Sequence, residues 1–367
     1  MNSLSVHEDK NLIFLGHAGF IYKTSQFLLL MDPWVDSDGA YFKSWFQFPC
    51  NHHIEKDLIN LLENDTRDKF VYISHNDKDH MDLSFLKKIN KLQIKFLIPD
   101  FSRKIEMLSN LKNCCGINID KIHLFKDNSC LKIYDHKLKF YIQDSERESD
   151  SSILVKSKGF NFLNSNDCKL HDRIPTIIKE EGNIDILTMQ FSGAAWHPIA
   201  YRKYYGKNKY NKLSLARKLH RFRNVSNTIK NCGIKNYIPS AGPPCFLDPL
   251  LFNTNFETNN IFPDSKEVSK FLNKNNNELN IINLFPGDIL NFQDLQISKY
   301  FQENPFFKGL DPYENKHAYL KKYQSLHIAK FKKNSINNHK KLINKFCKDL
   351  TEKLNLFDFI EEIDINL

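Results

Sequence analysis

The chain has 367 residues, a formal net charge of +9 and 41% apolar residues. That length suits one large domain or two smaller ones, and the apolar content excludes a wholly disordered protein. No run approaches the ~18 apolar residues that a membrane span needs, and no secretory signal is visible at the N-terminus. The eight cysteines lack any Cys-x-x-Cys spacing, which favours a reduced, cytoplasmic protein.

The excess positive charge lies in one segment. Residues 316–348 contain ten lysines and no acidic residue, and the tail at 349–367 is acidic. A segment that is only locally basic gives weak support for nucleic-acid binding. Nucleic acid is therefore not the expected partner, and nothing in the sequence indicates a membrane.

The first half of the chain is rich in short apolar blocks that favour strands. A helix is predicted at 83–92 from the spacing of its apolar residues. Strands are predicted on both sides of it, at 11–15, 20–23, 27–31, 70–73, 94–98 and repeatedly through 121–163.

The second half alternates helices and strands. Helices are predicted at 173–182 and 213–232, the latter ended by Gly233. Strands are predicted at 184–190, 236–239 and 280–285, and the chain beyond Tyr313 is helical and lysine-rich. Two strand-rich halves with interspersed helices predict two packed sheets with helices outside.

A polar loop with four possible metal ligands follows the strand at 70–73. The sequence SHNDKDHMD places His75, Asp77, Asp79 and His80 within six residues. Imidazole nitrogen and carboxylate oxygen together suit iron, manganese or zinc. The alternative is a polar turn, in which Asp and Asn serve only the turn geometry.

The loop resembles the His-x-His-x-Asp-His signature of the metallo-β-lactamase superfamily. The segments LGHAGFIY and FLLLMDPWV are similar to the opening of that fold, and FLNSNDC places Asp167 at the family's metal-bridging aspartate. The further segments DHMDLSFLKK, MQFSGAAWHP and NYIPSAG resemble the lactamase-like domain of cytidine-monophosphate sialic-acid hydroxylases. The resemblance covers roughly residues 11–300, so we predict a catalytic domain over 1–312, followed by a lysine-rich helical extension over 313–367.

Two positions depart from the family pattern. Asp77 stands where the loop usually has its middle histidine, and counting back from Asp167 places Glu146 on or near the position of a third histidine. Glu148 and Asp144 are rivals for that position. Both changes replace nitrogen by oxygen, which favours iron or manganese over zinc. In this respect the chain resembles lactamase-fold diiron hydroxylases.

The resemblance implies a full ligand set for two metals. His75 and Asp77 would hold one metal, Asp79 and His80 the other, and Asp167 would bridge them. Glu146 would complete the second metal, and His197 is the expected last ligand, with substrate contact or a surface position as its alternatives. His17 would orient a ligand.

Other residues are expected around the substrate. Trp34 belongs to an aromatic cluster that could wall a pocket, and Trp196 lies in a glycine-containing loop that rims the site in this fold. Arg202 begins a stretch to Arg223 with nine basic residues and no acid. This stretch could grip an anionic substrate, bind nucleic acid, or form a solvated helix face.

Together these features predict a four-layered α/β/β/α sandwich with a helical C-terminal extension. The favoured function is a dinuclear non-haem iron monooxygenase with O2 as co-substrate, acting on a small, anionic or nucleotide-linked molecule. Manganese and zinc stay open as metals. Electrons would come from a separate donor protein, because the sequence has no Rieske pattern. The alternatives are a metal-dependent hydrolase of a phosphodiester or lactone, and a non-catalytic scaffold without metal.

Overall fold

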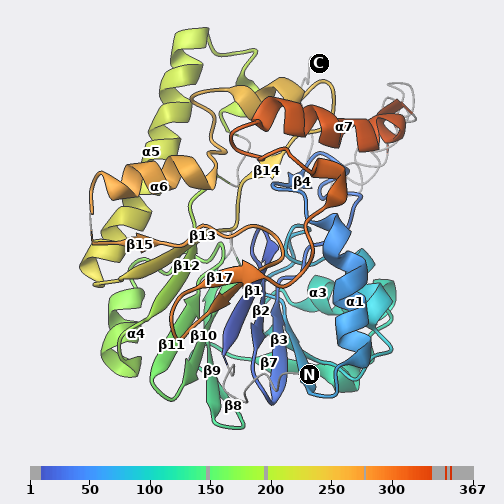
Figure 1. The fold of residues 1–367 in the computed structure, drawn as a ribbon, viewed down its shortest axis with the longest axis vertical. Helices are drawn as coiled ribbons and strands as arrows, with labels where there is room; N and C mark the ends of the chain where they lie inside the picture. The colour runs from blue at the N-terminus through green and yellow to red at the C-terminus, as the bar shows by residue number, and fades with distance from the viewer. Residues whose placement is uncertain are drawn as a thin grey trace, which may run out of the picture.

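Two β-sheets packed face to face form the centre of the computed structural model, which describes residues 10–145, 149–193, 197–276, 278–332, 344 and 348. Helices cover the outer side of each sheet (Figure 1). The predicted α/β/β/α sandwich is confirmed. Over the described residues, no helix is long and apolar enough to cross a membrane.

The first sheet is built mainly from the N-terminal third of the chain. Strands β1, β2 and β3 run antiparallel, and β3, β5, β6 and β7 run parallel. In spatial order its strands are β17 (Ile297–Lys299), β16 (Asp288–Asn291), β1 (Asn11–Gly16), β2 (Gly19–Lys23), β3 (Phe27–Met31), β5 (Asp68–Tyr72), β6 (Lys95–Pro99) and β7 (Ile122–Phe125).

The second sheet comes from the middle of the chain. Its strands β8 to β11 are antiparallel, and β11, β12, β13 and β15 are parallel. In spatial order its strands are β15 (Asn280–Ile281), β13 (Asn236–Ser240), β12 (Ile186–Gln190), β11 (Phe160–Asn164), β10 (Ser149–Ser157), β9 (His136–Asp144) and β8 (Cys130–Ile133).

Alternating side chains explain why these strands stack as two layers. Leu12 and Phe14 of β1 join the core between the sheets, whereas Ile13 and Leu15 pack beneath the outer helices. Because successive side chains of a strand point to opposite faces, a strand that is apolar at every position must be covered on both sides. The N-terminal strands satisfy this condition, since all six residues of β1 are buried.

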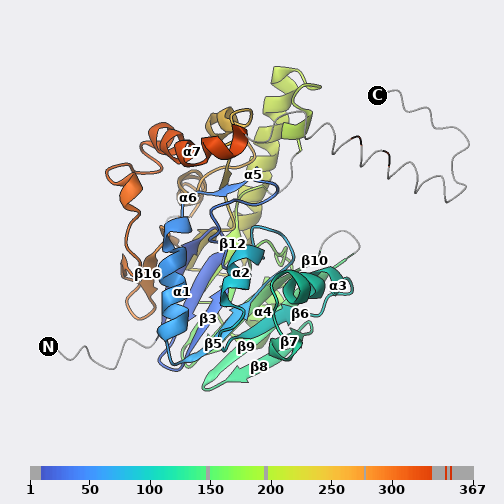
Figure 2. The same ribbon diagram turned by 90° about the vertical axis from the view of Figure 1, so that its right-hand side faces the viewer.

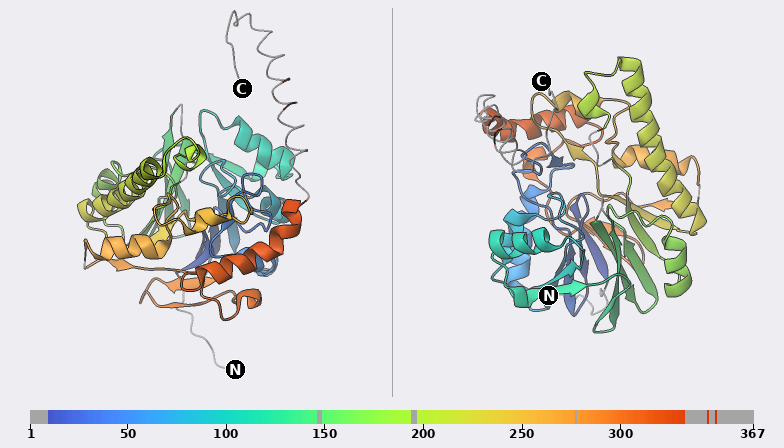
Figure 3. Two further views of the ribbon diagram at one scale, coloured as in Figure 1. Left: turned by 90° about the horizontal axis from the view of Figure 1, so that it is seen from above. Right: turned by 180° about the vertical axis from the view of Figure 1, so that it is seen from behind.

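The helices divide between the two outer faces, as Figures 2 and 3 show from the side, from above and from behind. The first sheet is covered by α1 (Glu55–Asn64), α2 (Leu83–Ile89) and α3 (Ile105–Ser109). The second is covered by α4 (Ile174–Glu181), α5 (Lys207–Asn231) and α6 (Ser265–Asn273). Shorter helical turns are His52–Ile54, Asn110–Cys114, Ile119–Lys121, Ile199–Tyr201, Phe252–Phe256 and Pro305–Phe307.

The C-terminal helix α7 (Lys316–Lys332) packs across one end of the sandwich. Its side chains Tyr319 and Tyr323 join a cluster with Phe46 of β4 (Phe46–Gln47) and Cys245 of β14 (Pro244–Cys245). The predicted helical extension is thus present from Lys316. The boundary between 312 and 313 stays a prediction.

The topology places the loops that follow several strands at one edge of the sandwich. Strands β1, β3 and β5 share one direction and end at the same edge. Strand β10 runs antiparallel to β11, so β10 begins at the edge where β11 ends. Residues that follow β1, β3, β5 and β11, and those that begin β10, are therefore neighbours in space although distant in sequence.

The core between the sheets predicts a strong effect of one aromatic deletion. Phe140 is 1% exposed, and its ring stacks on Phe125 with centroids 3.9 Å apart. Phe140→Ala should lower the free energy of unfolding by about 3–5 kcal/mol through lost burial and a cavity. Phe42, which is fully exposed, is the control: Phe42→Ala should change it by about 0.5 kcal/mol or less. Denaturant unfolding measures both, and equal losses would contradict this description of the core.

Candidate metal centre

The metal-loop residues are held by a firmly anchored turn between β5 and α2. The amides of His80 and Met81 both donate to the Asp77 carbonyl, at 3.0 and 2.7 Å. Asp82 then caps α2 by accepting from the Phe85 amide at 2.9 Å. Its second carboxylate oxygen accepts from the amides of Val35 and Asp36. The loop is thereby fixed at both ends, which suits a site that must hold ligands in place.

One group of clustered ligands contains His75, His80 and Asp167. His80 Nε2 lies 3.5 Å from Asp167 Oδ1. Both atoms are buried, and neither has a hydrogen-bond partner among the described residues. Burying such atoms without a partner costs free energy, so a cation between them is the simplest way to satisfy both.

Asp150 is a further carboxylate at this group, contributed by the start of β10. Its Oδ1 lies 3.3 Å from His75 Nδ1, and Asp77 Oδ2 lies 3.5 Å from His75 Nε2. Burial favours the neutral imidazole, but these two carboxylates hold the pKa of His75 well above its usual range. For Asp150, burial raises the pKa of the carboxyl above its usual range, although the nearby His75 acts in the opposite direction. The surroundings of His75 thus favour a positive charge, which a metal ion would supply.

A second group contains His17, Asp79 and His80, all buried. His17 Nε2 lies 3.1 Å from Asp79 Oδ2, and the Tyr41 hydroxyl donates to Asp79 Oδ1 at 2.7 Å. Burial alone would raise the pKa of Asp79, but the hydrogen bond from His17 and the charge of His80 bring it below its usual range. Asp79 is therefore ionised and held by two neighbours.

His80 is oriented from behind by Asp32, which follows β3. Asp32 and His80 are both completely buried. His80 Nδ1 lies 2.9 Å from Asp32 Oδ2, while Asp32 also accepts from the Ser74 amide and hydroxyl at 2.7 and 2.6 Å. With the proton on Nδ1, the Nε2 lone pair faces Asp167.

Local backbone geometry at these positions is unusual. His17 and Asp32 adopt left-handed conformations, with φ of 53° and 43°, and the β1–β2 pairing shifts register between Phe14 and Gly16. Such bulges and strained residues redirect side chains at strand ends. Here the residues in left-handed conformations are His17, which contacts Asp79, and Asp32, which contacts His80.

The donor set fits a dinuclear metal centre. The two ligand groups share His80, and a carboxylate such as Asp167 can span two ions. Three imidazoles (His17, His75, His80) face four carboxylates (Asp77, Asp79, Asp150, Asp167). Nitrogen and oxygen ligands in this proportion suit iron, manganese or zinc, whereas thiolate is absent from both described groups.

Several predicted site residues lie elsewhere or outside the described residues. Glu146 and Trp196 are outside them. His197 is in neither ligand group: its ring nitrogens lie 3.2 Å from the Tyr205 hydroxyl and 3.4 Å from the Arg217 guanidinium. Arg202 pairs with Glu257. Asp144, a rival for the Glu146 position, is exposed and accepts from Ser102 and Ser149.

Sequence reasoning missed Asp150, Asp32 and Tyr41. Asp150 lies four residues beyond Glu146, in the sequence SDSS that opens a strand, and the acids at every second position from 144 to 150 left the register ambiguous. Asp32 stands in MDPW directly after an apolar strand, which is a recognisable signal for a residue at a sheet edge. Nothing in the sequence pattern singled out Tyr41.

A cavity of about 530 Å³ opens beside the metal loop. Trp34, Tyr41, Phe42 and Asp77 are among the residues that line it. Trp34 also meets the ring of His17 edge-on at 5.2 Å. The expectation that Trp34 walls a pocket therefore has a structural counterpart next to the metal ligands.

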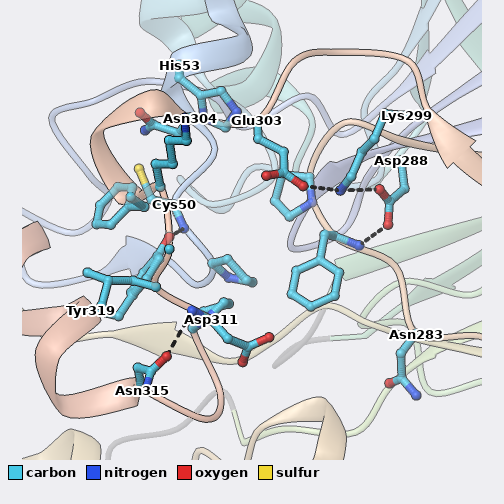
Figure 4. Close-up of a pocket in the computed structure, with 18 of the residues that line it drawn as sticks. Cys50, His53, Asn283, Asp288, Lys299, Glu303, Asn304, Asp311, Asn315 and Tyr319 are labelled. Carbon is cyan, nitrogen blue, oxygen red and sulfur yellow. Dashed lines mark hydrogen bonds and ion pairs between the residues drawn. The ribbon is translucent and has the colours of Figure 1, made fainter.

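A larger cavity of about 790 Å³ lies beside α7 and contains none of the candidate ligands (Figure 4). Three of its charged groups are paired with one another: Lys299 Nζ lies 2.6 Å from Asp288 Oδ1 and 3.7 Å from Glu303 Oε1. Cys50 donates its amide to the Tyr319 hydroxyl. This cavity is therefore separate from the metal centre.

Comparison with curated proteins finds relatives of the chain among proteins named as iron–sulfur proteins and as hydroxylases. No protein-family model matches it. It is 31% identical over 259 residues to a Mycobacterium tuberculosis protein named as a Rieske 2Fe-2S iron–sulfur protein, covering 68% of this chain and 48% of that one. The cytidine monophosphate-N-acetylneuraminic acid hydroxylase of Macaca mulatta is 24% identical over 274 residues, covering 72% and 43%. The chain spans about half the length of the curated relatives it matches.

The comparison with solved structures finds matches over more than three quarters of this chain. A metallo hydrolase from Ignicoccus hospitalis, Igni18, has a TM-score of 0.48 and 12% identity, covering 77% of this chain and 98% of its own. The diiron β-hydroxylase CmlA from Streptomyces venezuelae has a TM-score of 0.47 and 13% identity, covering 79% and 54%. The predicted resemblance to the metallo-β-lactamase fold and to the sialic-acid hydroxylases is confirmed.

Asp32→Asn tests the support for His80. The amide nitrogen cannot accept the hydrogen bonds that the carboxylate accepts from Ser74 and His80, so His80 should lose its fixed orientation. Metal affinity should fall about 10–100-fold, measured by competition for Mn²⁺ with a chelator. Asp36→Asn, at a half-buried residue that lines the nearby cavity, should leave affinity unchanged. Equal affinity in Asp32→Asn and the wild type would show that His80 needs no such support.

Proposed function

We propose that the chain is the metal-binding catalytic part of an O2-dependent hydroxylase with a dinuclear iron centre. The observation that carries the proposal is the carboxylate-rich ligand set. Asp150 contacts His75 at 3.3 Å, and Asp77 stands where a zinc hydrolase of this fold has histidine. Four carboxylates can balance the charge of two divalent ions and of the more highly charged oxidised pair. Hard oxygen ligands favour iron or manganese over zinc.

The ligands would divide between two metal positions. His75, Asp77 and Asp150 would hold one ion, Asp79, His80 and His17 the other, and Asp167 would bridge. A bound iron pair would supply the binding and reduction of O2, which no amino-acid side chain provides. The surrounding residues fix that pair: Asp32 keeps the proton on His80 Nδ1, and the Tyr41 hydroxyl holds Asp79. Trp34 and Tyr41 shield the ligands from bulk water on the side of the 530 Å³ cavity.

The substrate we propose is a small molecule, and an anionic or nucleotide-linked part of it would contact basic residues. Arg202, Lys207 and Tyr205 line a cavity of about 470 Å³ at the start of α5. The named relatives include hydroxylases of a cytidine-monophosphate sugar, which is consistent with such a substrate. Electrons would be delivered by a separate donor protein, and the lysine-rich sequence after Tyr313 would attract an acidic one.

The ligand chemistry can be tested at Asp77, because its side chain is 62% exposed and its replacement should not disturb folding. Asp77→His restores the imidazole of the zinc hydrolases. We expect the wild type to contain iron and to consume O2, and the variant to shift toward zinc and lose O2 uptake. Both are purified from the same medium and analysed for metal, with Asp120→His, at an exposed carboxylate on Ile119–Lys121, as the control.

The opposite result would favour a different reaction. A wild type loaded with zinc, free of iron and active on an ester or phosphodiester without O2 would replace the oxygenase by a hydrolase. In that chemistry a metal-activated water attacks the substrate. A wild type that binds no metal would leave a non-catalytic scaffold.

A further inference from the structure

On the inner face of the second sheet, the side chains change from apolar to polar along the strands. Phe162 of β11 and Ile186 of β12, which pair with each other, belong to the apolar core between the sheets. Two residues further along the same two strands, the side chains on this face are the polar Asn164 and Thr188. The Thr188 hydroxyl donates to Asn164 Oδ1 at 2.7 Å. Polar groups therefore replace apolar ones as the strands approach the metal centre.

Three side chains at the far end of this polar region are buried and unpaired. Asn166, Ser192 and Ser240 are each at most 1% exposed. Asn166 Nδ2 and Oδ1, Ser192 Oγ and Ser240 Oγ have no hydrogen-bond partner within the described part of the chain. Buried hydroxyls and amides in folded proteins nearly always have a hydrogen-bond partner. Three neighbouring exceptions therefore indicate side chains whose hydrogen-bond partner is a bound molecule.

Backbone contacts place these three residues on adjacent strand ends. The Gln190 amide donates to the Asn166 carbonyl at 3.0 Å, and Gln190 pairs with Ser240 across β12 and β13. A side chain on Gly242 would lie 2.3 Å from Ser192 Cβ, so the backbone after Ser240 passes directly against Ser192. The three residues therefore span adjacent strand ends, about 5 Å from strand to strand.

The same edge carries the metal ligands. Asn166 directly precedes Asp167, and the Ala241 amide donates to the His17 carbonyl at 3.0 Å. A molecule bound to Asn166, Ser192 and Ser240 would thus lie between the two loops that present Asp167 and His17.

We propose that Asn166, Ser192 and Ser240 form a substrate-binding subsite for a neutral group that carries both hydrogen-bond donors and acceptors, such as a hydroxyl or a carboxamide. Calling the bound group a substrate rests on the proposed function, whereas the subsite itself does not. The three side chains together offer donors and acceptors and no charge. A carboxylate or phosphate only accepts hydrogen bonds, so it would leave the acceptor oxygen of the Asn166 amide without a partner.

The subsite can be tested because an unpaired hydroxyl has opposite effects on stability and on binding. Removing a buried hydroxyl that lacks a partner relieves a desolvation cost. Ser192→Ala and Ser240→Ala should therefore keep or raise the melting temperature, by about 2–4 °C at most. The double variant should bind lactamide at least tenfold more weakly than the wild type. Lactate, which differs from lactamide in having a carboxylate in place of the carboxamide, should show no dependence on the two serines.

Two control variants separate binding from packing. Ser214 is a buried, unpaired serine on α5, so Ser214→Ala should also keep or raise the melting temperature but leave lactamide binding unchanged. Ser269 donates its hydroxyl to the Ser265 carbonyl at 2.7 Å, so Ser269→Ala should lower the melting temperature. Titrations by saturation-transfer NMR on the full chain, as purified with its metal, give the affinities.

Each other outcome overturns the inference. No lactamide binding by the wild type at 100 mM, or equal binding by the double variant, would remove the subsite. A lower melting temperature in Ser192→Ala and Ser240→Ala, as in Ser269→Ala, would show that these hydroxyls are already bonded in the free protein. Loss of lactate binding in parallel with lactamide would remove the preference for a neutral group. None of these readouts depends on which metal is bound or on O2 uptake, so the subsite and the oxygenase proposal can fail separately.

Discussion

The hydrogen bond between His80 and Asp32 links the metal loop to the first hairpin, and the rest of the site depends on it. Both side chains are completely buried, and their contact of 2.9 Å joins the end of β3 to the loop that follows β5. Asp32 can accept from His80 only because β3 and β5 run parallel and end at one edge. His80 in turn belongs to both ligand groups. A change in the register of β3 against β5 would therefore disturb both ligand groups.

The alternation of apolar residues explains why so much of the fold could be predicted. Blocks such as FLLLM are apolar at every position, which is typical of strands covered on both faces. The predicted helix at 173–182 corresponds to α4, and that at 213–232 to most of α5, which begins earlier, at Lys207. Helices α1 and α6 were not predicted, although α6 carries a capping box formed by Asp264 and Glu267. Short amphipathic helices such as these depend more on packing than on local sequence.

The limits at the metal centre have a physical cause. The structure brings His75 and Asp167 together with His80, and Asp79 together with His80, because the loops after β5 and β11 lie at the same edge of the sandwich. Asp150 could not be assigned, since counting residues back from Asp167 requires the length of the turn between β9 and β10. A run with acids at 144, 146, 148 and 150 offers a carboxylate at every second position. Only the pairing of Asp150 with Gln143 identifies which acid begins β10, and its contact with His75 then gives it a role.

The most direct test of the account is the position of bound metal. Crystals of protein grown with iron, measured on both sides of the iron absorption edge, would locate each ion independently of activity. The account predicts two anomalous peaks about 3.5–4 Å apart. One should contact His75 and Asp150, the other Asp79 and His80, with Asp167 touching both. A single peak, or two peaks of which neither contacts Asp150, would contradict the dinuclear, carboxylate-rich centre.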